Sequence, residues 1–397
     1  MLSFPAHARS IVQDLGASRI REVANAGIGR EGVLPFWFGE PDETTPAFIR
    51  EAAKAGLDAG ETFYTHNYGL PTLRAAISAY LSALHAPIAA ERIAVTSSGV
   101  SALMLLSQLI INPGDRVVAV TPLWPNLVEI PRILGAEVVT VPLQFGRDPA
   151  APLWELDLDA LLAALTPDTR AVLINSPNNP TGWVITRAQQ EAILAHCRRH
   201  GIWIVADDVY ERLVYDLPVD GRACAPSFLD IGAPEDRIIS ANSFSKSWLM
   251  TGWRLGWVVA PAEIMNDLGK LIEYNTSCAP GFVQRAGTVA IEQGADIIER
   301  TVTRYQTARD FLHARLNALP GITAPKPKGA MYLFFRVDGA TDTLDLCKRL
   351  VREAGLGLAP GSAFGAEGEG YVRWCFASSL ERLADGAQRL EKFLAAR

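Results

Sequence analysis

The residues best suited to chemistry in this 397-residue chain are polar side chains gathered in a few short motifs. One motif is a turn of small residues, including Ser98 and Gly99, that runs directly into a predicted helix. The free backbone N–H groups of such a turn and the positive end of the helix dipole suit a phosphate group. The other motifs supply an aromatic ring, amides, carboxylates with a phenol, and serines with a lysine and an arginine: Trp124; Asn175, Asn178 and Asn179; Asp207, Asp208 and Tyr210; Ser243, Ser245, Lys246 and Arg254.

Each motif taken alone also has an ordinary structural explanation. A loop rich in Asn and Pro is usually a turn, an aspartate after a strand often caps a helix, and a single lysine is usually solvated. Considered together, the motifs supply a phosphate cradle, a stacking ring, a carboxylate, a phenol, an amide and a lysine. An anionic, aromatic cofactor needs this combination, so we expect these residues to share one site.

The elements that must position these motifs are strands that alternate with helices. Each motif follows a short run rich in β-branched residues, and helical patterns separate several of the runs. This alternation indicates a mostly parallel sheet covered on both faces, and ligands of such sheets bind beyond the carboxyl ends of the strands. The expected fold class is α/β, with a large domain built on a mostly parallel seven-stranded sheet flanked by helices. The runs begin at Ile93, Arg116, Glu137, Arg170, Ile202, Arg237 and Gly256.

The pattern changes after about residue 290. A long helical stretch leads to a strand, a second helix and a second strand, at residues 295–319, 331–337, 344–354 and 371–377. This order predicts a smaller α+β domain that the N-terminal segment completes. We place the large domain at residues 41–289 and the small domain at residues 1–40 together with 290–397.

The motifs, in this order, resemble those of the class I and II aminotransferases, fold-type I enzymes that use pyridoxal 5'-phosphate (PLP). The strongest match, at residues 243–256, resembles the motif around the lysine that holds PLP as a Schiff base, with an arginine eight residues after the lysine. The segments 179–182 and 207–210 resemble two further family motifs. The resemblance spans residues 38–373 and therefore covers nearly the whole chain.

This resemblance implies catalytic roles for Lys246, Asp207 and Tyr210. Lys246 would form the Schiff base with PLP and, once substrate displaces it, move a proton between the substrate Cα and the cofactor. Asp207 would pair with the pyridinium nitrogen and keep it protonated, so that the ring accepts electrons. Tyr210 and Asn179 would hydrogen-bond the phenolic oxygen of the ring, and Trp124 would stack on its face.

The resemblance also implies how the phosphate and a second subunit are bound. Serine hydroxyls, backbone N–H groups and a bidentate guanidinium would hold the phosphate. Tyr64 resembles the tyrosine that reaches the phosphate of the partner subunit, so a homodimer with shared active sites is implied. The phosphate-binding residues would be Ser98, Gly99, Val100, Ser243, Ser245 and Arg254.

On the substrate side, the resemblance assigns the α-carboxylate to Arg373, which would grip it with two N–H groups and so orient the Cα–H bond. Gly39 would add a backbone contact to the same carboxylate, and a side chain there would crowd the substrate. Asn179 and Trp124 would also face the substrate.

Departures from the family pattern bear on the substrate. Val100 stands where an aspartate-using branch carries a lysine for the second carboxylate, and residues 274–280 offer no basic side chain. Trp124, in contrast, is like the residue of dicarboxylate-using enzymes. Because an acidic donor would lack a cation and aromatic residues cluster at 36–38, we expect a neutral, apolar or aromatic L-amino acid as donor and a 2-oxo acid as acceptor.

Composition excludes several other classes of protein. A net charge of −6 gives no reason to expect nucleic acid or an anionic membrane as partner. Five scattered cysteines without a C-x-x-C pair indicate free thiols, and with no secretory signal or membrane-spanning stretch they favour the cytoplasm. His196 and His200 lie four residues apart on a predicted helix but lack a third ligand nearby, so we expect no metal site.

Two alternatives to transamination stay open at this point. A carbon–sulfur or β-lyase, or a cyclising synthase, would use the same lysine and the same carboxylate clamp, because the sequence does not show which substrate bond is held perpendicular to the ring. A non-catalytic effector-binding domain of a transcription regulator would need a DNA-binding module. The segment before residue 38 is too short for a winged helix of the usual size, which argues against the regulator.

Overall fold

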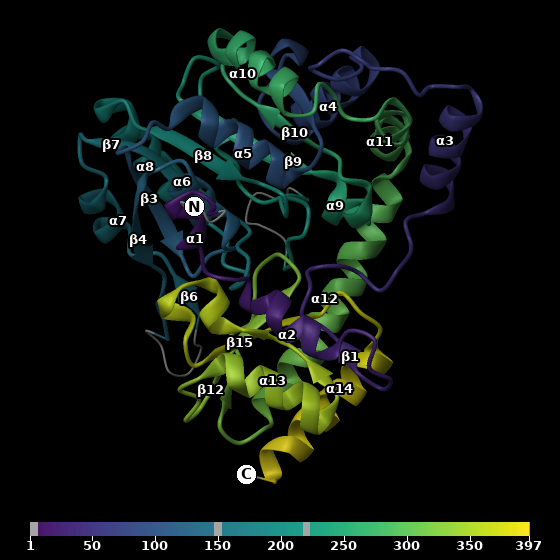
Figure 1. The fold of residues 1–397 in the computed structure, drawn as a ribbon, viewed down its shortest axis with the longest axis vertical. Coiled ribbons are helices and arrows are strands. Elements are labelled where there is room, and N and C mark those ends of the chain that lie inside the picture. The colour runs from purple at the N-terminus through teal and green to yellow at the C-terminus, as the bar shows by residue number, and fades with distance from the viewer. Residues whose placement is uncertain (1–6, 147–152, 217–222, 397) are drawn as a thin grey trace, which may run out of the picture.

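A seven-stranded sheet covered by helices forms the upper part of the molecule in Figure 1. The computed structural model describes residues 7–146, 153–216 and 223–396. Strand β10 is antiparallel to both of its neighbours, and the other neighbouring pairs are parallel. The predicted α/β fold with a mostly parallel seven-stranded sheet is therefore confirmed. In spatial order the strands are β2 (Ile93–Thr96), β10 (Gly256–Val259), β9 (Ile238–Ser243), β8 (Trp203–Asp207), β7 (Thr169–Asn175), β3 (Arg116–Thr121) and β4 (Glu137–Pro142).

Both faces of this sheet are buried. Successive residues of a strand point to opposite faces, so Val118 and Ile204 join one hydrophobic cluster while Val117 and Val205 join the other. Burial on both faces explains why the strands appear in the sequence as continuous apolar runs. The first face is covered by α4 (Pro71–Leu84), α7 (Leu158–Ala164) and α8 (Arg187–His200), and the second by α5 (Gly99–Ile110), α6 (Asn126–Ile133) and α10 (Ala262–Asn275).

Local sequence signals mark both ends of helix α8. The Thr186 side chain accepts the N–H of Gln189, and the Gln189 side chain in turn accepts the N–H of Thr186. Gly201 then ends the helix with a φ of 68°, a left-handed conformation that favours glycine. Local signals thus set both ends of one of the helices that cover the sheet.

The lower part of Figure 1 contains a four-stranded antiparallel sheet, in the order β11 (Ile322–Thr323), β12 (Tyr332–Val337), β15 (Tyr371–Cys375) and β14 (Ala359–Pro360). The N-terminal segment joins it, because β1 (Leu34–Pro35) pairs in parallel with β13 (Leu356–Gly357) and α2 (Arg19–Gly27) packs on α13 (Thr343–Ala354). Helix α12 (Ala295–Asn317) contacts both α9 (Phe244–Ser247) of the upper part and α14 (Leu380–Ala395) of the lower part.

The remaining elements belong neither to the two larger sheets nor to the helices named above. They are α1 (Ser10–Gln13), α3 (Ala47–Asp58), α11 (Gly281–Gln293), β5 (Gln144–Phe145), β6 (Trp154–Glu155) and the short 3-10 helices Ala90–Arg92, Phe228–Asp230, Thr251–Trp253, Gly361–Phe364 and Ala366–Gly368. Among the described residues, no helix is long and apolar enough to cross a membrane, and no three His, Cys, Asp or Glu residues are grouped to hold a metal ion. The five cysteines are all free thiols.

Candidate active site

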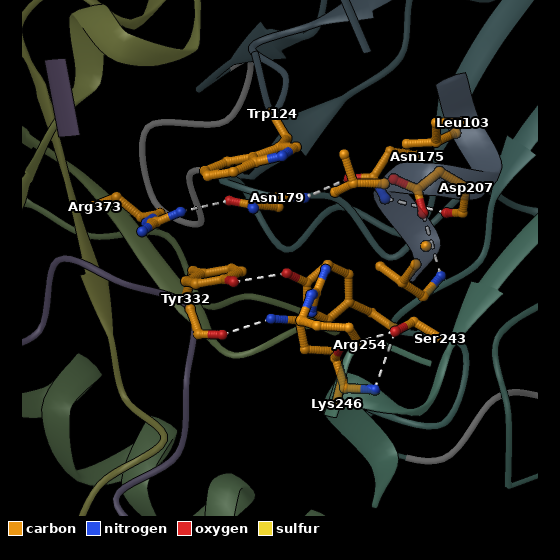
Figure 2. A pocket seen from close by; sticks show the side chains of 16 residues that line it. Leu103, Trp124, Asn175, Asn179, Asp207, Ser243, Lys246, Arg254, Tyr332 and Arg373 are labelled. Atoms are coloured by element: carbon orange, nitrogen blue, oxygen red, sulfur yellow. Dashed lines mark hydrogen bonds between the residues drawn. The ribbon is translucent and has the colours of Figure 1, made fainter. Parts of the chain in front are cut away.

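A cavity lies at the carboxyl ends of the parallel strands, and Tyr332 of β12 and Arg373 of β15 line it from the lower part (Figure 2). The cavity and its open mouth together contain about 680 Å³ that no protein atom fills. The motifs that the sequence places after separate strands therefore come together, and the lower part adds the remaining wall. The lining residues are Gly39, Gly99, Val100, Leu103, Trp124, Asn175, Asn179, Asp207, Val209, Tyr210, Ser243, Ser245, Lys246, Arg254, Tyr332 and Arg373.

Lys246 lies in the one-turn helix α9 that directly follows β9. Its Nζ donates a hydrogen bond to the carbonyl oxygen of Gly39 at 2.5 Å and lies 5.7 Å from the centre of the Tyr210 ring. Removal of the amine from water lowers its pKa from 10.5 to about 8. A larger fraction of the amine than usual is therefore neutral near physiological pH, as a nucleophile or a base requires.

Asp207 is the last residue of β8, and Figure 2 shows its side chain near Asn175 and Leu103. The carboxylate accepts one long hydrogen bond, from the N–H of Val209 at 3.4 Å, while the Asn175 side chain donates to the Asp207 carbonyl oxygen at 3.1 Å. Burial and the neighbouring Asp208 carboxylate raise the pKa of Asp207 to about 7. A cationic N–H group in the cavity would offset both effects, because it stabilises the ionised form.

A group of N–H and O–H donors surrounds the starts of α5 and α9. Gly99 and Val100 open α5, so their backbone N–H groups have no partner within the helix. The Ser243 hydroxyl donates to the Ser245 hydroxyl at 2.8 Å and accepts the backbone N–H of Ser245 at 3.0 Å. Arg254 joins this group with a φ of 55°, a left-handed conformation that few residues other than glycine adopt. Such a set of donors fits a phosphate.

Arg373 lies in the middle of β15 and is fully buried, which is rare for an arginine. Its two terminal nitrogens donate to Asn179 Oδ1 at 2.9 Å and to the carbonyl oxygen of Trp37. The guanidinium carbon lies 4.4 Å from the centre of the Tyr332 ring and 4.9 Å from that of Phe364. Its Nε is buried and finds no hydrogen-bond partner among the described residues. A guanidinium fixed in this way, with a donor left over, fits a carboxylate.

Aromatic residues complete the cavity wall. The hydroxyl oxygens of Tyr210 and Tyr332 are 2.7 Å apart, and both side chains are buried. Trp124 is half-buried and presents its ring to the cavity in Figure 2. A Cβ atom at Gly39 would lie 1.9 Å from the Tyr332 hydroxyl, so that Tyr332 leaves room only for glycine at this position.

Comparison with known proteins shows which family builds a site of this kind. The model of a family described as aminotransferase class I and II matches residues 32–390. An aspartate aminotransferase from Pyrococcus horikoshii is 34% identical over 381 residues, which are 95% of this chain and 94% of the relative. Aromatic-amino-acid aminotransferase 2 from Thermococcus litoralis is 33% identical over 383 residues, or 95% of each chain. The structure of an aspartate aminotransferase from Thermotoga maritima matches with a TM-score of 0.87 and 32% identity over 98% of this chain and 100% of the other.

The chain belongs to the class I and II aminotransferases. The predicted family, the transaminase activity and the PLP cofactor are thereby confirmed.

The cavity of this aminotransferase fits PLP on its own chemistry. Arg254, together with the donors at the starts of α5 and α9, matches the phosphate, and Lys246 has the lowered pKa that attachment to an aldehyde requires. The raised pKa of Asp207 reflects burial and the neighbouring Asp208 carboxylate, and the ring nitrogen of PLP, which is cationic when protonated, would offset both. The indole of Trp124 offers a plane on which the ring can stack.

Two of the residues that were given a role from the family resemblance do not line the cavity of this aminotransferase. Ser98 is buried, and its hydroxyl caps α5 by accepting the N–H of Ser101 at 2.9 Å. Tyr64 is 89% exposed and lies with Phe63 and Arg285 along a separate surface groove. The expected role of Tyr64 concerns a second subunit, so it stays a prediction, as does a direct role for Ser98 at the phosphate.

Four lining residues were given no role from the family resemblance: Leu103, Asn175, Val209 and Tyr332. Asn175 ends the strand β7 and belongs to the predicted amide motif, so its position was expected although its contact with Asp207 was not. Leu103 and Val209 are apolar neighbours of predicted residues and look like ordinary core in the sequence. Tyr332 opens a strand of the lower part, 122 residues from its hydrogen-bond partner Tyr210, and no local pattern links the two.

Proposed function

We propose that this aminotransferase moves the amino group of a neutral, apolar or aromatic L-amino acid to a 2-oxo acid. The observation that carries the proposal is the set of cations in the cavity wall, which are Lys246, Arg254 and Arg373. The cofactor aldehyde, the phosphate and the substrate α-carboxylate account for all three. A second carboxylate would therefore lose water without gaining a cation from this chain, and Val100 at the cavity edge is apolar. Both an aspartate and an aromatic-amino-acid aminotransferase are among the relatives, so the family alone does not decide.

The proposed roles divide the chemistry among this chain's own residues. Lys246 attaches the cofactor and then moves the proton from the substrate Cα. Asp207 keeps a proton on the ring nitrogen, and Arg373 orients the α-carboxylate with the help of Asn179. When bound, PLP supplies a ring that accepts the electron pair left at Cα and then carries the amino group. The support is geometric: these side chains line one cavity.

The substrate proposal is tested on the holoenzyme without any 2-oxo acid. Single L-amino acids are added while the visible absorbance of the bound cofactor is recorded. We expect aromatic and large aliphatic donors to convert it to the pyridoxamine form faster than aspartate or glutamate. Faster conversion by aspartate would overturn the neutral-donor proposal. Pyruvate or ammonia released without an acceptor would instead favour the lyase.

We also propose a homodimer in which Tyr64 of one subunit reaches the phosphate of the other. Phe63, Tyr64 and Tyr274 are 84%, 89% and 91% exposed, and exposed aromatic groups of this size often mark protein interfaces. Mixed dimers of Lys246→Ala and Tyr64→Ala subunits test this arrangement. One of their two sites would combine an intact lysine with an intact tyrosine, so both cofactor affinity and activity should recover. No recovery would mean that Tyr64 acts within its own subunit or not at all.

The domain boundaries and the compartment remain proposals of the same kind. The pairing of β1 with β13 supports a small domain made from residues 1–40 and 290–397, of which residues 1–6 and 397 lie outside the described part of the chain. The large domain would then be 41–289. The five free cysteines support a reducing compartment such as the cytoplasm.

A further inference from the structure

The paired hydroxyls of Tyr210 and Tyr332 have a consequence for how the cofactor is held. Both side chains are buried, and burial raises the pKa of both phenols, so each keeps its proton. Two neutral hydroxyls 2.7 Å apart share a single hydrogen bond, in which one donates and the other accepts. The direction of that bond decides whether the proton of Tyr210 remains available to the cavity.

Several contacts besides the hydroxyl pair fix the position of the Tyr332 side chain. It lies on β12, paired with Cys375 of β15, and the Arg373 guanidinium covers its ring at 4.4 Å. Gly39 borders its hydroxyl on another side. Among the described residues, Tyr210 is the only hydrogen-bond partner of the Tyr332 hydroxyl. The groups that face the two phenols are Asp207 of β8, Lys246 of α9, and Arg373 and Cys375 of β15.

We propose that Tyr332 is a positioning residue whose hydroxyl donates to the Tyr210 oxygen, so that the Tyr210 proton points at the phenolic oxygen of the cofactor. The proposal rests on the proposed role of Tyr210. A hydroxyl that accepts one hydrogen bond becomes a better donor in the next, so Tyr332 also strengthens the bond that Tyr210 makes. The lower part of the molecule thereby tunes a cofactor held by the upper part.

The pH titration of the visible absorbance of the bound cofactor tests this proposal. Donation from Tyr210 stabilises the phenolate form of the cofactor. The nitrogen that joins the cofactor to Lys246 then becomes less basic, so it loses its proton at a lower pH. Loss of the full bond in Tyr210→Phe should raise the titration midpoint by up to about one pH unit. Tyr332→Phe should raise it in the same direction but less, by about 0.3 unit. Because Tyr332 acts through Tyr210, the double variant should shift no further than Tyr210→Phe.

Controls separate this role from a general loss of stability. Tyr371→Phe removes a phenol hydroxyl from the neighbouring strand β15, where the ring stacks on Phe334, and should leave the midpoint unchanged. An unchanged midpoint in Tyr332→Phe, or additive shifts in the double variant, would overturn the positioning role of Tyr332. An unchanged midpoint in Tyr210→Phe itself would instead overturn the role proposed for Tyr210. The two failures are thus distinguishable.

Discussion

The turn that follows β8 has two faces. We call the face toward the active-site cavity the open face and the face toward a buried polar cluster the closed face. Asp207 and Tyr210 line the active-site cavity, whereas Asp208 and Glu211, one residue further along in each case, belong to a buried cluster outside it. Both faces are removed from water, and both contain titratable groups. They differ in whether this chain supplies the partners.

The cluster around His85 obtains its counter-charges from this chain, although the buried Nη1 of Arg187 has no hydrogen-bond partner among the described residues. Its Nδ1 lies 2.8 Å from an Asp230 oxygen and its Nε2 lies 3.3 Å from a Glu211 oxygen. Arg187 also bonds Asp230 at 2.6 Å, and Tyr80 donates to Glu211 at 3.1 Å. Each of these acidic side chains therefore has both a cation and a further donor. The cluster ties the end of α4 to the turn that carries Asp207 and Tyr210.

The cavity, in contrast, is left short of partners. Arg373 keeps an unused buried donor, and the Asp207 carboxylate accepts only one long hydrogen bond among the described contacts. The pKa values of Lys246 and His85 reflect this difference, whereas burial raises the pKa of both Asp207 and Asp208 to about 7. Burial lowers the pKa of Lys246 to about 8; it would also lower that of His85, but Asp230 and Glu211 outweigh it and raise the pKa to about 10. A buried charge persists where the chain supplies its counter-charge, and a binding site leaves that counter-charge to the ligand.

The largest effect is expected from removal of the reactive amine on the cavity face. Lys246→Ala should abolish the visible absorbance of covalently attached cofactor and reduce transamination by at least about a thousandfold, because nucleophile and proton carrier are lost together. The exposed Lys270→Ala serves as the control. Absorbance spectra and single-turnover assays measure both effects. Residual turnover of a few per cent would sink the assignment of Lys246.

Removal of a partner on the closed face should act on stability. His85→Asn leaves the Glu211 and Asp230 carboxylates without the imidazolium, and we expect a loss of about 3 to 5 kcal/mol in the free energy of unfolding near pH 7. Urea unfolding measures it, with the exposed His200→Asn as control. A loss below about 1 kcal/mol would show that His85 is not charged in the folded protein.

The sign of the pH dependence follows from the raised pKa of His85. Its ordinary pKa is 6.5 and its folded value is about 10, so the folded protein binds this proton more tightly than the unfolded chain. The stabilisation is complete below pH 6.5 and disappears as the pH rises through about 10. The difference in stability between the wild type and His85→Asn should therefore shrink steadily over this range. A constant difference would mean that packing, not charge, explains the loss.

The carboxylate clamp is expected to show a smaller effect, confined to activity. Arg373→Lys keeps the charge but loses the planar pair of N–H donors, so kcat/KM for the best amino donor should fall about tenfold to a hundredfold. Arg336→Lys, an exposed arginine on the neighbouring strand β12, is the matched control. Steady-state kinetics with a single donor measures the loss. Unchanged kcat/KM would remove Arg373 from the proposed clamp.

The sequence predicts those contacts of the two faces that follow from the order of strands along the chain. Parallel strands end at one edge, so the order of strands and motifs along the chain suffices to place the residues after each strand together, Asp207 and Lys246 among them. Periodicity shows which face a residue occupies but not which distant residue meets it. The contact of Tyr332 with Tyr210 and that of His85 with Glu211 join positions 122 and 126 residues apart, and both depend on how separate elements pack. The open face was therefore predictable in outline, and the closed face was not.

The lowered pKa of Lys246 can be tested without any change to the closed face. Only the neutral amine attacks the aldehyde, so the rate at which cofactor-free protein captures PLP should rise about tenfold per pH unit below pH 8 and level off above it. Stopped-flow absorbance between pH 7 and pH 10 measures this rate. A rate that still climbs at pH 10 would place the pKa near the ordinary 10.5 and contradict the effect of burial.

The smallest expected effect concerns the rim of the cavity, where Val100 is 39% exposed. Val100→Lys adds a cation like those that the closed face supplies to its own carboxylates, so it should improve kcat/KM for aspartate relative to a neutral donor. Water screens an ion pair at such a position, which limits the gain to about twofold to fivefold. Val100→Met, of similar length without charge, separates electrostatics from shape. An equal gain in Val100→Met would show that space, and not the missing cation, limits acidic donors.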